Sequence, residues 1–360
     1  MAHRAHHAQS QPNPAHCNLS SSRAAPHFRA AVVARAQPLE MEEIDPATGM
    51  PLLSSIANPV TDLKVQVNGV GWAYRRSTVD ATKASADKPT VLLLHGAGSS
   101  SFCWRTTLYL LGEAGYDAIA PDFPGHGNSD KPGSSDVYSE AGMIAGIDGF
   151  VAALGLKTPL ALGVQGFITS QYGLLWALKN ESKVARLMIL NTPVALGSKL
   201  RPELAAYKTI SFLRPKGTFD SNTFCGSGNA YVIDYRTAEA YALPYADPAA
   251  TAAVATIVDK CDFSALVKRV SSGYQLWRKP SVLLFGGADP FVKVKDVFDF
   301  LDDKRTNMKV ISSPAKLGHC PQEDYPEAVH ESMLPWLAGE TDEWKSGRIM
   351  KMTKRGGVEV

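Results

Sequence analysis

The sequence VLLLHGAGSSSFCWR at residues 91–105 and the sequence YDAIAPDFPGHGNSDKP at residues 116–132 decide the fold of this chain. Each begins with a short apolar run and continues into a polar turn rich in glycine. A short apolar run bounded by turn residues is typical of a strand buried in a parallel sheet. The carboxyl ends of such strands meet at one edge of the sheet, where ligands of open α/β sheets bind. We therefore expect both turns to lie at a ligand site.

Strands and helices alternate on both sides of these stretches. Residues 63–77 alternate apolar and polar around Asn68-Gly69, which predicts a hairpin. Further strands are predicted over residues 90–94, 116–121, 160–164, 185–190, 281–285 and 308–311, and helices over 101–114, 139–154, 167–179, 292–301 and 326–337. Strands alternating with helices indicate an α/β fold, here an eight-stranded, mostly parallel sheet covered by helices.

The alternation is interrupted between residues 195 and 279, where helical and irregular segments follow one another without strands. This insertion predicts a helical cap that follows the sixth strand and lies above the carboxyl ends of the strands. The predicted core then comprises residues 63–194 and 280–339. Residues 37–62 are a lead-in, and the charged residues 340–360 are expected to form a flexible tail.

The first 39 residues contain no Asp or Glu and are rich in Ala, Ser and His, with arginines at Arg4, Arg23, Arg29 and Arg35. This composition is typical of an organelle transit peptide and differs from that of a secretory signal. We predict a transit peptide over residues 1–36. No amphipathic arginine helix is evident, which favours the chloroplast (the stroma or the periphery of the thylakoid) over the mitochondrion. A disordered tail without a targeting role is the alternative.

The overall composition is that of a globular protein with a formal net charge of +2. So small a charge gives no electrostatic reason to expect a nucleic-acid partner. The five cysteines lack the spacing of metal ligands, and no dinucleotide- or phosphate-binding motif is present. We therefore expect no metal, no cofactor and no transmembrane segment. The expected partner is a small molecule, and the sequence points to no particular protein partner.

The motif HGxGxSSxxWR after one strand, followed by PDxPGHGxSDKP after the next, resembles the α/β-hydrolase superfamily, nearest to its epoxide-hydrolase and haloalkane-dehalogenase-like branch. The segment YALPYAD at residues 241–247 is similar to cap sequences of that branch. The resemblance implies a triad in the chain order nucleophile, acid, histidine, with Asp289 as the acid and His319 as the base. Taken singly, Asp289 could begin a turn or helix and His319 could be an ordinary loop histidine. Their order and spacing favour the pair.

The nucleophile position departs from the family pattern. That pattern, G-x-S-x-G with Ser or Asp at its centre, aligns with GVQGF at residues 163–167. The alignment puts Gln165 in the nucleophile position and Phe167 in place of the second glycine, where Gly166 could still permit the turn. A carboxamide donates and accepts hydrogen bonds but cannot form the acyl- or alkyl-enzyme that the family uses. Other candidate nucleophiles, each with weaker support, are Ser99, Ser100, Ser101, Thr169 and Cys320.

The resemblance also implies an oxyanion hole formed by backbone N–H groups near Ala97 and Gly166. The pocket beside this hole is expected to be lined by His95, Gly96, Phe102, Phe123, Phe167 and Trp277. For the aromatic residues of the set, packing in the core is the alternative role.

These residues leave two main functions open. In the first, His319 and Asp289 activate water directly and hydrolyse a small ester- or epoxide-like substrate, which Gln165 helps to polarise. In the second, the chain is a non-catalytic pseudoenzyme that binds a ligand or serves as an assembly or scaffold factor in the plastid. A lyase with His319 as general base is a third. A wet cavity between Gln165 and His319 would favour the hydrolase, and a cavity filled by Phe167 and Phe102 would favour the pseudoenzyme.

Overall fold

The structure is a computed structural model that describes residues 60–229, 232–301, 308–312, 317–344, 349–353 and 356–359. All of these residues belong to the compact unit Val32–Val360. The predicted transit peptide, residues 1–36, and the lead-in up to residue 59 lie outside the described residues. Within the described part, no helix is both long enough and apolar enough to span a bilayer.

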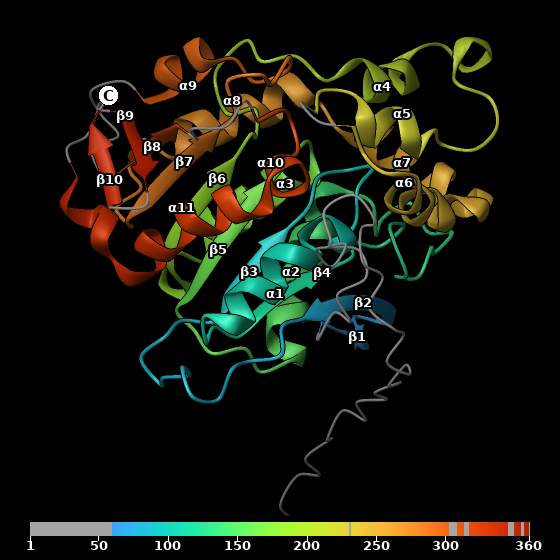
Figure 1. Cartoon of the computed structure of the whole chain (residues 1–360). Helices are drawn as coiled ribbons and strands as arrows, with labels where there is room; N and C mark the ends of the chain where they lie inside the picture. The colour runs from blue at the N-terminus through green and yellow to red at the C-terminus, as the bar shows by residue number, and fades with distance from the viewer. Residues whose placement is uncertain are drawn as a thin grey trace, which may run out of the picture. The chain divides into compact units, whose positions relative to one another are not determined.

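A ten-stranded sheet runs through this unit in the order β1-β2-β4-β3-β5-β6-β7-β8-β9-β10 (Figure 1). The strands are β1 (Thr61–Val67), β2 (Val70–Arg76), β3 (Val91–Leu94), β4 (Ala118–Pro121), β5 (Leu160–Gln165), β6 (Val184–Leu190), β7 (Ser281–Phe285), β8 (Met308–Ser312), β9 (Ile349–Thr353) and β10 (Gly356–Glu359). Neighbours from β4 through β9 pair in parallel, whereas β1 pairs antiparallel with β2, and β2 with β4. The predicted eight-stranded, mostly parallel sheet is confirmed in β1–β8.

Two further strands lie in the segment predicted to be a flexible tail, residues 340–360. The structure corrects that prediction: η6 (Glu340–Glu343) follows the last helix, β9 pairs with β8, and β10 pairs with β9. The charged composition had indicated a solvated segment. However, β8 would otherwise leave backbone N–H and C=O groups unpaired at the edge of the sheet, and a strand of almost any composition can pair with them.

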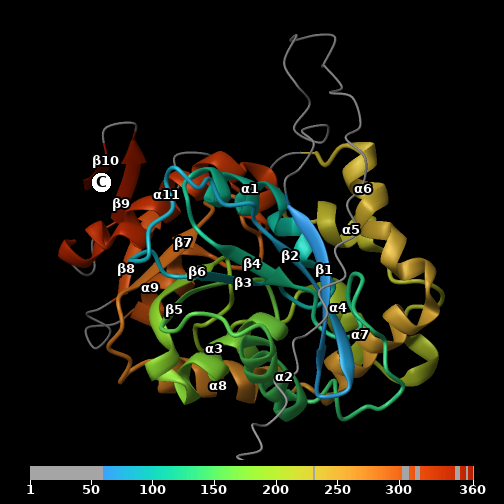
Figure 2. The same ribbon diagram turned by 90° about the horizontal axis from the view of Figure 1, so that it is seen from below.

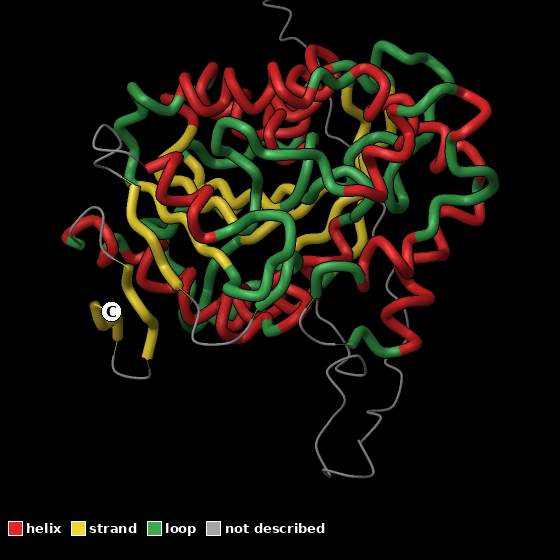
Figure 3. Tube along the Cα trace, turned by 90° about the horizontal axis from the view of Figure 1, so that it is seen from above, coloured by secondary structure: helices red, strands yellow, loops and turns green. Residues whose placement is uncertain are grey.

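Helices cover both faces of the sheet (Figures 2 and 3). On one face lie α1 (Arg105–Glu113) and α11 (Pro326–Ala338), and on the other lie α2 (Glu140–Ala153), α3 (Thr169–Lys179) and α8 (Phe263–Gly273). In addition, η1 (Ser101–Trp104) precedes α1, α9 (Val294–Leu301) connects β7 to β8, and α10 (Pro321–Asp324) precedes α11. The strands between the two layers are apolar and buried, as VLLL at residues 91–94 shows, because neither face of the sheet meets water.

The described residues between β6 and β7 form five α-helices and no strand. They are α4 (Pro202–Ala205), α5 (Ser221–Gly226), α6 (Tyr235–Ala242), α7 (Pro248–Lys260) and α8. Each of the last four is preceded by an aspartate whose carboxylate accepts from a first-turn amide: Asp220, Asp234, Asp247 and Asp262. Such caps satisfy backbone donors that a helix leaves free at its start. Helices α4–α7 gather beyond one end of the sheet, at the right of Figure 1, as the predicted cap.

A buried charge pair connects the core to the cap. Arg105, the first residue of α1, donates two hydrogen bonds of 2.7 Å to the carboxylate of Glu323 on α10. The hydroxyl of Tyr241, on α6, donates to the same carboxylate at 2.7 Å. The Phe102 ring packs beside both: its centre lies 4.1 Å from the guanidinium carbon of Arg105 and 5.1 Å from the ring of Tyr241. Each buried charge is therefore paired, as burial requires.

Two buried histidines tie together the loops that follow β3 and β4. Nε2 of His95 accepts from the backbone N–H of Phe123 at 3.1 Å, and Nε2 of His126 accepts from that of Gly98 at 3.0 Å. Their Nδ1 atoms lie 2.8 Å and 3.2 Å from backbone carbonyls, so each neutral ring carries its hydrogen on Nδ1. Burial lowers the pKa of His95 to about 4 and that of His126 to about 3. Both contacts between the loops depend on rings that stay uncharged.

We expect this pair to make the protein less stable in acid. In the unfolded chain a histidine binds its proton near pH 6.5, but in the folded protein these two do so only near pH 4 and pH 3. Between those values the unfolded state holds more protons. The free energy of unfolding therefore falls, by about 1 kcal/mol per pH unit for each histidine, as the pH is lowered below 6.5. Above that pH the contribution is complete and constant.

Urea unfolding of wild type and His126→Gln, measured from about pH 7.5 down to about pH 5, checks this expectation. Glutamine can still accept from the Gly98 N–H but does not titrate. The variant should therefore lose stability less steeply than wild type as the pH falls. Parallel curves for the two proteins would show that His126 is not the buried neutral group described here.

Candidate active site

The predicted acid and base lie at the carboxyl edge of the sheet. Asp289 follows β7 and His319 follows β8, and Nδ1 of His319 lies 3.0 Å from Oδ2 of Asp289. Both side chains are buried, with exposed fractions of 3% for His319 and 0% for Asp289. A carboxylate at Nδ1 keeps the hydrogen there and leaves Nε2 as the basic atom of the ring. This is the arrangement that a general base needs.

Backbone groups hold the carboxylate of Asp289 from another direction. Its Oδ1 accepts from the N–H of Phe291 at 2.7 Å and from that of Val292 at 3.2 Å. Asp289 therefore begins the turn before α9 and also orients His319, so that both roles considered for it from the sequence are present. Together the three contacts fix the plane of the carboxylate and, through it, the orientation of the imidazole.

The turn between β5 and α3 has positive φ angles at two residues. After β5 ends at Gln165, Gly166 has φ = 100°, and Ile168 has φ = 62° and ψ = −72°. The N–H of Thr169 donates to the carbonyl of Phe167 at 2.8 Å, which closes a three-residue turn around Ile168. A positive φ at a β-branched residue costs about 1–3 kcal/mol. Such a strained strand-to-helix turn is where the nucleophile stands in the G-x-S-x-G elbow.

Ile168, and not Gln165, stands at the tip of this turn. Its hydrocarbon side chain is fully buried and has no atom that could attack a substrate. Gln165 lies within the strand: its Nε2 donates to the backbone carbonyl of His319 at 2.8 Å, and its Oε1 accepts from Gln322 at 3.1 Å. These contacts correct the prediction that Gln165 occupies the nucleophile position. The carboxamide joins β5 to the segment that carries His319.

The chain's own carbonyl occupies the predicted oxyanion hole. The N–H of Ala97 donates to the oxygen of Phe167 at 2.8 Å, and this is the same oxygen that accepts from Thr169. One amide from the loop after β3 and one from the first residue of α3 thus converge on a single oxygen, as they would on an oxyanion. Ala97 is a donor as predicted, but the second donor is Thr169 and not Gly166. Both amides are already bonded within the protein.

Aromatic rings lie against the base. The centres of the Phe167 and Phe291 rings are each 5.2 Å from the centre of the His319 imidazole. From the cap, the carbonyl of Gly228 accepts from the backbone N–H of His319 at 2.5 Å. A Cβ at residue 228 would come within 2.7 Å of the Phe291 ring, so the cap backbone lies directly on this site. The imidazole is therefore packed among hydrocarbon groups.

The other residues predicted to line the pocket do not contact the His319 ring in the described contacts. His95 and Phe123 pack edge to face with ring centres 5.2 Å apart, inside the loops after β3 and β4. Gly96 lies against the elbow, and Phe102 packs against the cap. Trp277 is a correction: its Nε1 donates to Ser281, the first residue of β7, at 2.8 Å. It therefore lies at the amino end of that strand, away from the site, because the insertion ends where β7 begins.

Structural contacts also involve the weaker candidate nucleophiles. Ser100 accepts from the Phe102 N–H and caps η1, while Thr169 donates its hydroxyl hydrogen to the His95 carbonyl at 2.8 Å. The sulfur of Cys320 lies 3.8 Å from Nε2 of Gln165. Burial raises the pKa of the Cys320 thiol, which disfavours the nucleophilic thiolate.

The sequence analysis does not identify two residues of the site, Ile168 and Phe291. A signal for Ile168 is present, since Gly166 and Ser170 flank it with the small-residue spacing of the elbow motif. An isoleucine at the centre gives no reason to choose that alignment over the one centred on Gln165. Nothing in the sequence distinguishes Phe291 from a core aromatic residue.

The described residues contain no group of three or more His, Cys, Asp or Glu side chains that could hold a metal ion. They do line an open hollow of about 390 Å³ beside β1 and β2, with Tyr74, Arg75, Ser101 and Asp122 among its lining residues. Neither His319 nor Asp289 lines it. The acid–base pair and this hollow are therefore separate features.

Known proteins resemble this chain in sequence over most of its length. A model of the alpha/beta hydrolase family matches residues 91–332. Haloalkane dehalogenase 1 of Mycobacterium tuberculosis is 27% identical over 263 residues, which cover 69% of this chain and 83% of that protein. A haloalkane dehalogenase of Psychrobacter cryohalolentis is 28% identical over 262 residues, covering 70% of this chain and 84% of that protein.

The fold is also that of a solved structure. The crystal structure of the haloalkane dehalogenase DbeA from Bradyrhizobium elkani matches with a TM-score of 0.65 and 21% identity, over 78% of this chain and 98% of that one. The family model runs from β3 into α11 and includes the elbow, the cap and the acid–base pair. On these grounds the chain belongs to the alpha/beta hydrolase family.

Proposed function

We propose that this chain is a non-catalytic member of its family, a pseudoenzyme that binds a small molecule at the junction of cap and core. The observation that carries the proposal is the elbow, with Ile168 at its tip and the Phe167 carbonyl between the two amides. Covalent hydrolysis needs a nucleophile at that tip. It also needs those amides for the charge that develops on the substrate oxygen. In this elbow, the hydrocarbon side chain of Ile168 stands where the nucleophile would be, and the Phe167 carbonyl accepts from both amides.

The packing of the base supports the same proposal. The rings of Phe167 and Phe291 lie against the His319 imidazole, so hydrocarbon packs around the group that would have to activate a water. The names of the relatives describe action on haloalkanes, which are small apolar molecules. Aromatic side chains such as those of Phe167 and Phe291 favour contact with a ligand of similar apolar character. We therefore propose a small apolar ligand.

The contact between His319 and Asp289 favours one other candidate, the direct hydrolysis of a small ester- or epoxide-like substrate. Nε2 of His319 would take a proton from water while the water oxygen bonds to the substrate carbon. The same proton would then pass to the leaving oxygen, and Asp289 would stabilise the imidazolium in between. This route requires the Phe167 ring to move and admit water.

Turnover by the full chain separates the two candidates. We expect p-nitrophenyl acetate, styrene oxide and 1-bromobutane to react no faster with the protein than in buffer, because no group at the elbow can attack them. His319→Ala is the control and should match wild type, with its fold checked by circular dichroism. Turnover that disappears in His319→Ala would overturn the non-catalytic proposal and establish the dyad as a water-activating base.

A matched pair of serine variants tests which residue stands at the tip of the elbow. Ile168→Ser would put a hydroxyl on the strained turn, whereas Gln165→Ser would put one inside β5. We expect a fluorophosphonate probe to label residue 168 slowly in the first variant, because the Phe167 ring must move to admit the probe. In the second variant we expect no label at residue 165, as read by mass spectrometry of folded protein. Labelling of Gln165→Ser alone would restore the original assignment of the nucleophile position.

We also propose that the protein acts in the chloroplast, on the basis of its acid-free, arginine-bearing leader. Residues 1–39 fused to a fluorescent reporter should direct it into plastids of a plant cell. A fusion with Arg23, Arg29 and Arg35 replaced by Glu is the matched control and should stay in the cytosol. Entry of the reporter into mitochondria, or no import at all, would contradict the assignment.

A further inference from the structure

The cap carries a group of large apolar side chains that are mostly exposed to solvent. They lie in residues 208–218, between α4 and α5, which we call the cap loop. Ile210, Phe212 and Leu213 lie within four consecutive positions and are 60%, 72% and 62% exposed. Single exposed apolar residues are ordinary on a protein surface, but a contiguous group marks a site of interaction.

The cap loop is held in place at its base and across its middle. Tyr207 and Phe219, on either side of it, are buried and stack with ring centres 6.3 Å apart. Arg214 donates two hydrogen bonds of 2.7 Å and 2.8 Å to the carboxylate of Asp259 on α7, and its Nε donates to the Thr209 carbonyl at 3.1 Å. These contacts keep the chain from folding its apolar residues inward, so their exposure is a built feature.

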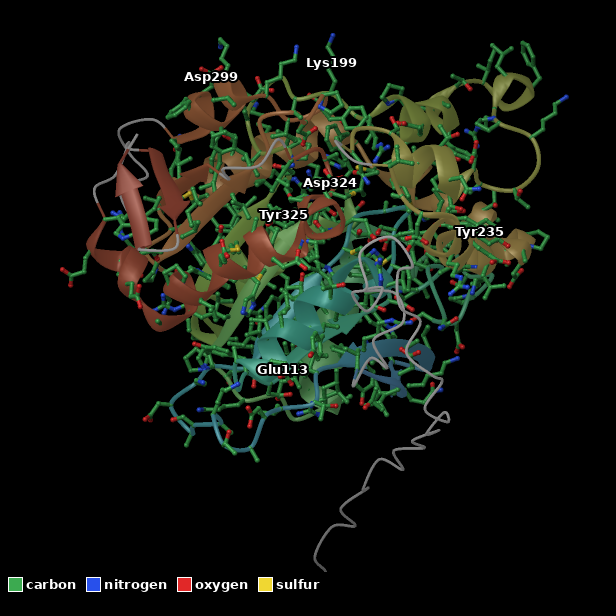
Figure 4. The ribbon with its side chains drawn as sticks, in the orientation of Figure 1. Glu113, Lys199, Tyr235, Asp299, Asp324 and Tyr325 are labelled. Carbon is green, nitrogen blue, oxygen red and sulfur yellow. The ribbon has the colours of Figure 1, made fainter. Side chains whose placement is uncertain are left out.

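The charges around the cap loop are mainly positive. Residues 204–219 contain Lys208, Arg214 and Lys216 but no Asp or Glu. Of the acids beside the cap loop, Asp259 is paired with Arg214, Asp220 caps α5, and Glu203 is paired with Arg201. Lys208 donates to the backbone carbonyl of Asp259 at 3.0 Å, and Lys216 is exposed within the cap loop, so both place positive charge beside the apolar tip. Lys199, from the loop before α4, also extends outward from the upper edge of the molecule (Figure 4).

We propose that the cap loop is an interfacial anchor, which inserts Ile210, Phe212 and Leu213 into the surface of a bilayer that contains anionic lipid. Apolar side chains at a basic rim are the combination that binds such surfaces: the hydrocarbon enters the headgroup boundary, and lysines attract the lipid charge. The loop projects at the upper right of Figure 1 as a convex tip. A stable protein interface buries about 1,200 Å² or more, which three side chains on a projecting tip do not supply. This inference concerns where the protein is held and is independent of what its site binds.

Flotation of the full chain with lipid vesicles tests the proposal. Wild type should float with vesicles of phosphatidylcholine containing about 30% phosphatidylglycerol, and less so with pure phosphatidylcholine or at high salt. The double variant Phe212→Ser/Leu213→Ser should lower the bound fraction at least tenfold. Leu276→Ser is the matched control, because Leu276 is 76% exposed outside the cap loop, and it should bind as wild type does.

The contributions of the lysines and of the apolar side chains to membrane binding can be measured separately. Lys208→Gln/Lys216→Gln should weaken binding to anionic vesicles and leave weak binding to neutral ones unchanged. All variants should have the same melting temperature as wild type, since the substituted side chains are exposed. Wild type that fails to float, or a serine variant that floats equally well, would overturn the proposal. So would self-association of wild type, seen by light scattering and abolished by the serine variant, in the absence of flotation.

Discussion

The backbone of the loop after β3 lies directly against the turn after β5, and the rest of the site depends on this contact. It is possible because glycines stand at the closest approach. A Cβ on Gly96 would lie 2.5 Å from the nitrogen of Phe167, and one on Gly166 would lie 2.9 Å from the Cα of Gly96. The contact brings the Ala97 amide to the Phe167 carbonyl. Adjacent parallel strands deliver both loops to one edge, but only missing side chains let the backbones touch.

Periodicity and turn residues suffice to predict β1–β8 and the cap, because burial on both faces demands apolar runs of recognisable length. The contact of Asp289 with His319 is predictable too, since both follow strands that end at the same edge. The register of the elbow is not. The motif can be aligned on Gln165 or on Ile168, and only the backbone angles show that the turn closes at Ile168 and not at Gln165. Strand β9 escapes prediction because its pairing uses backbone groups that every residue has.

Ile168 keeps the strained backbone of a nucleophile elbow without carrying a nucleophile. Such a conformation persists only where its surroundings leave no alternative. Here the Thr169 hydroxyl donates to the His95 carbonyl at 2.8 Å, and the Ser170 hydroxyl donates to the Gly166 carbonyl at 2.6 Å. These bonds end on backbone atoms and do not involve the side chain at the tip. The surrounding hydrogen bonds therefore maintain the shape of the turn whatever side chain stands at its tip, whereas reactivity would depend on that side chain alone. The fold can thus be kept while the catalytic function is lost.

The buried pair of Arg105 and Glu323 has a consequence for movement of the cap. Both charges belong to the core, and the cap groups that hydrogen-bond to them among the described residues are uncharged, the hydroxyls of Tyr241 and Thr237. Displacing the cap would break hydrogen bonds worth about 1.5–3 kcal/mol each and would leave the ion pair whole. No charge would be stranded without its partner, which is the outcome that makes the separation of buried ions costly. The core half of this junction thus stays assembled in either position of the cap, and reclosure has only to return two hydroxyls to a carboxylate and a guanidinium already in place.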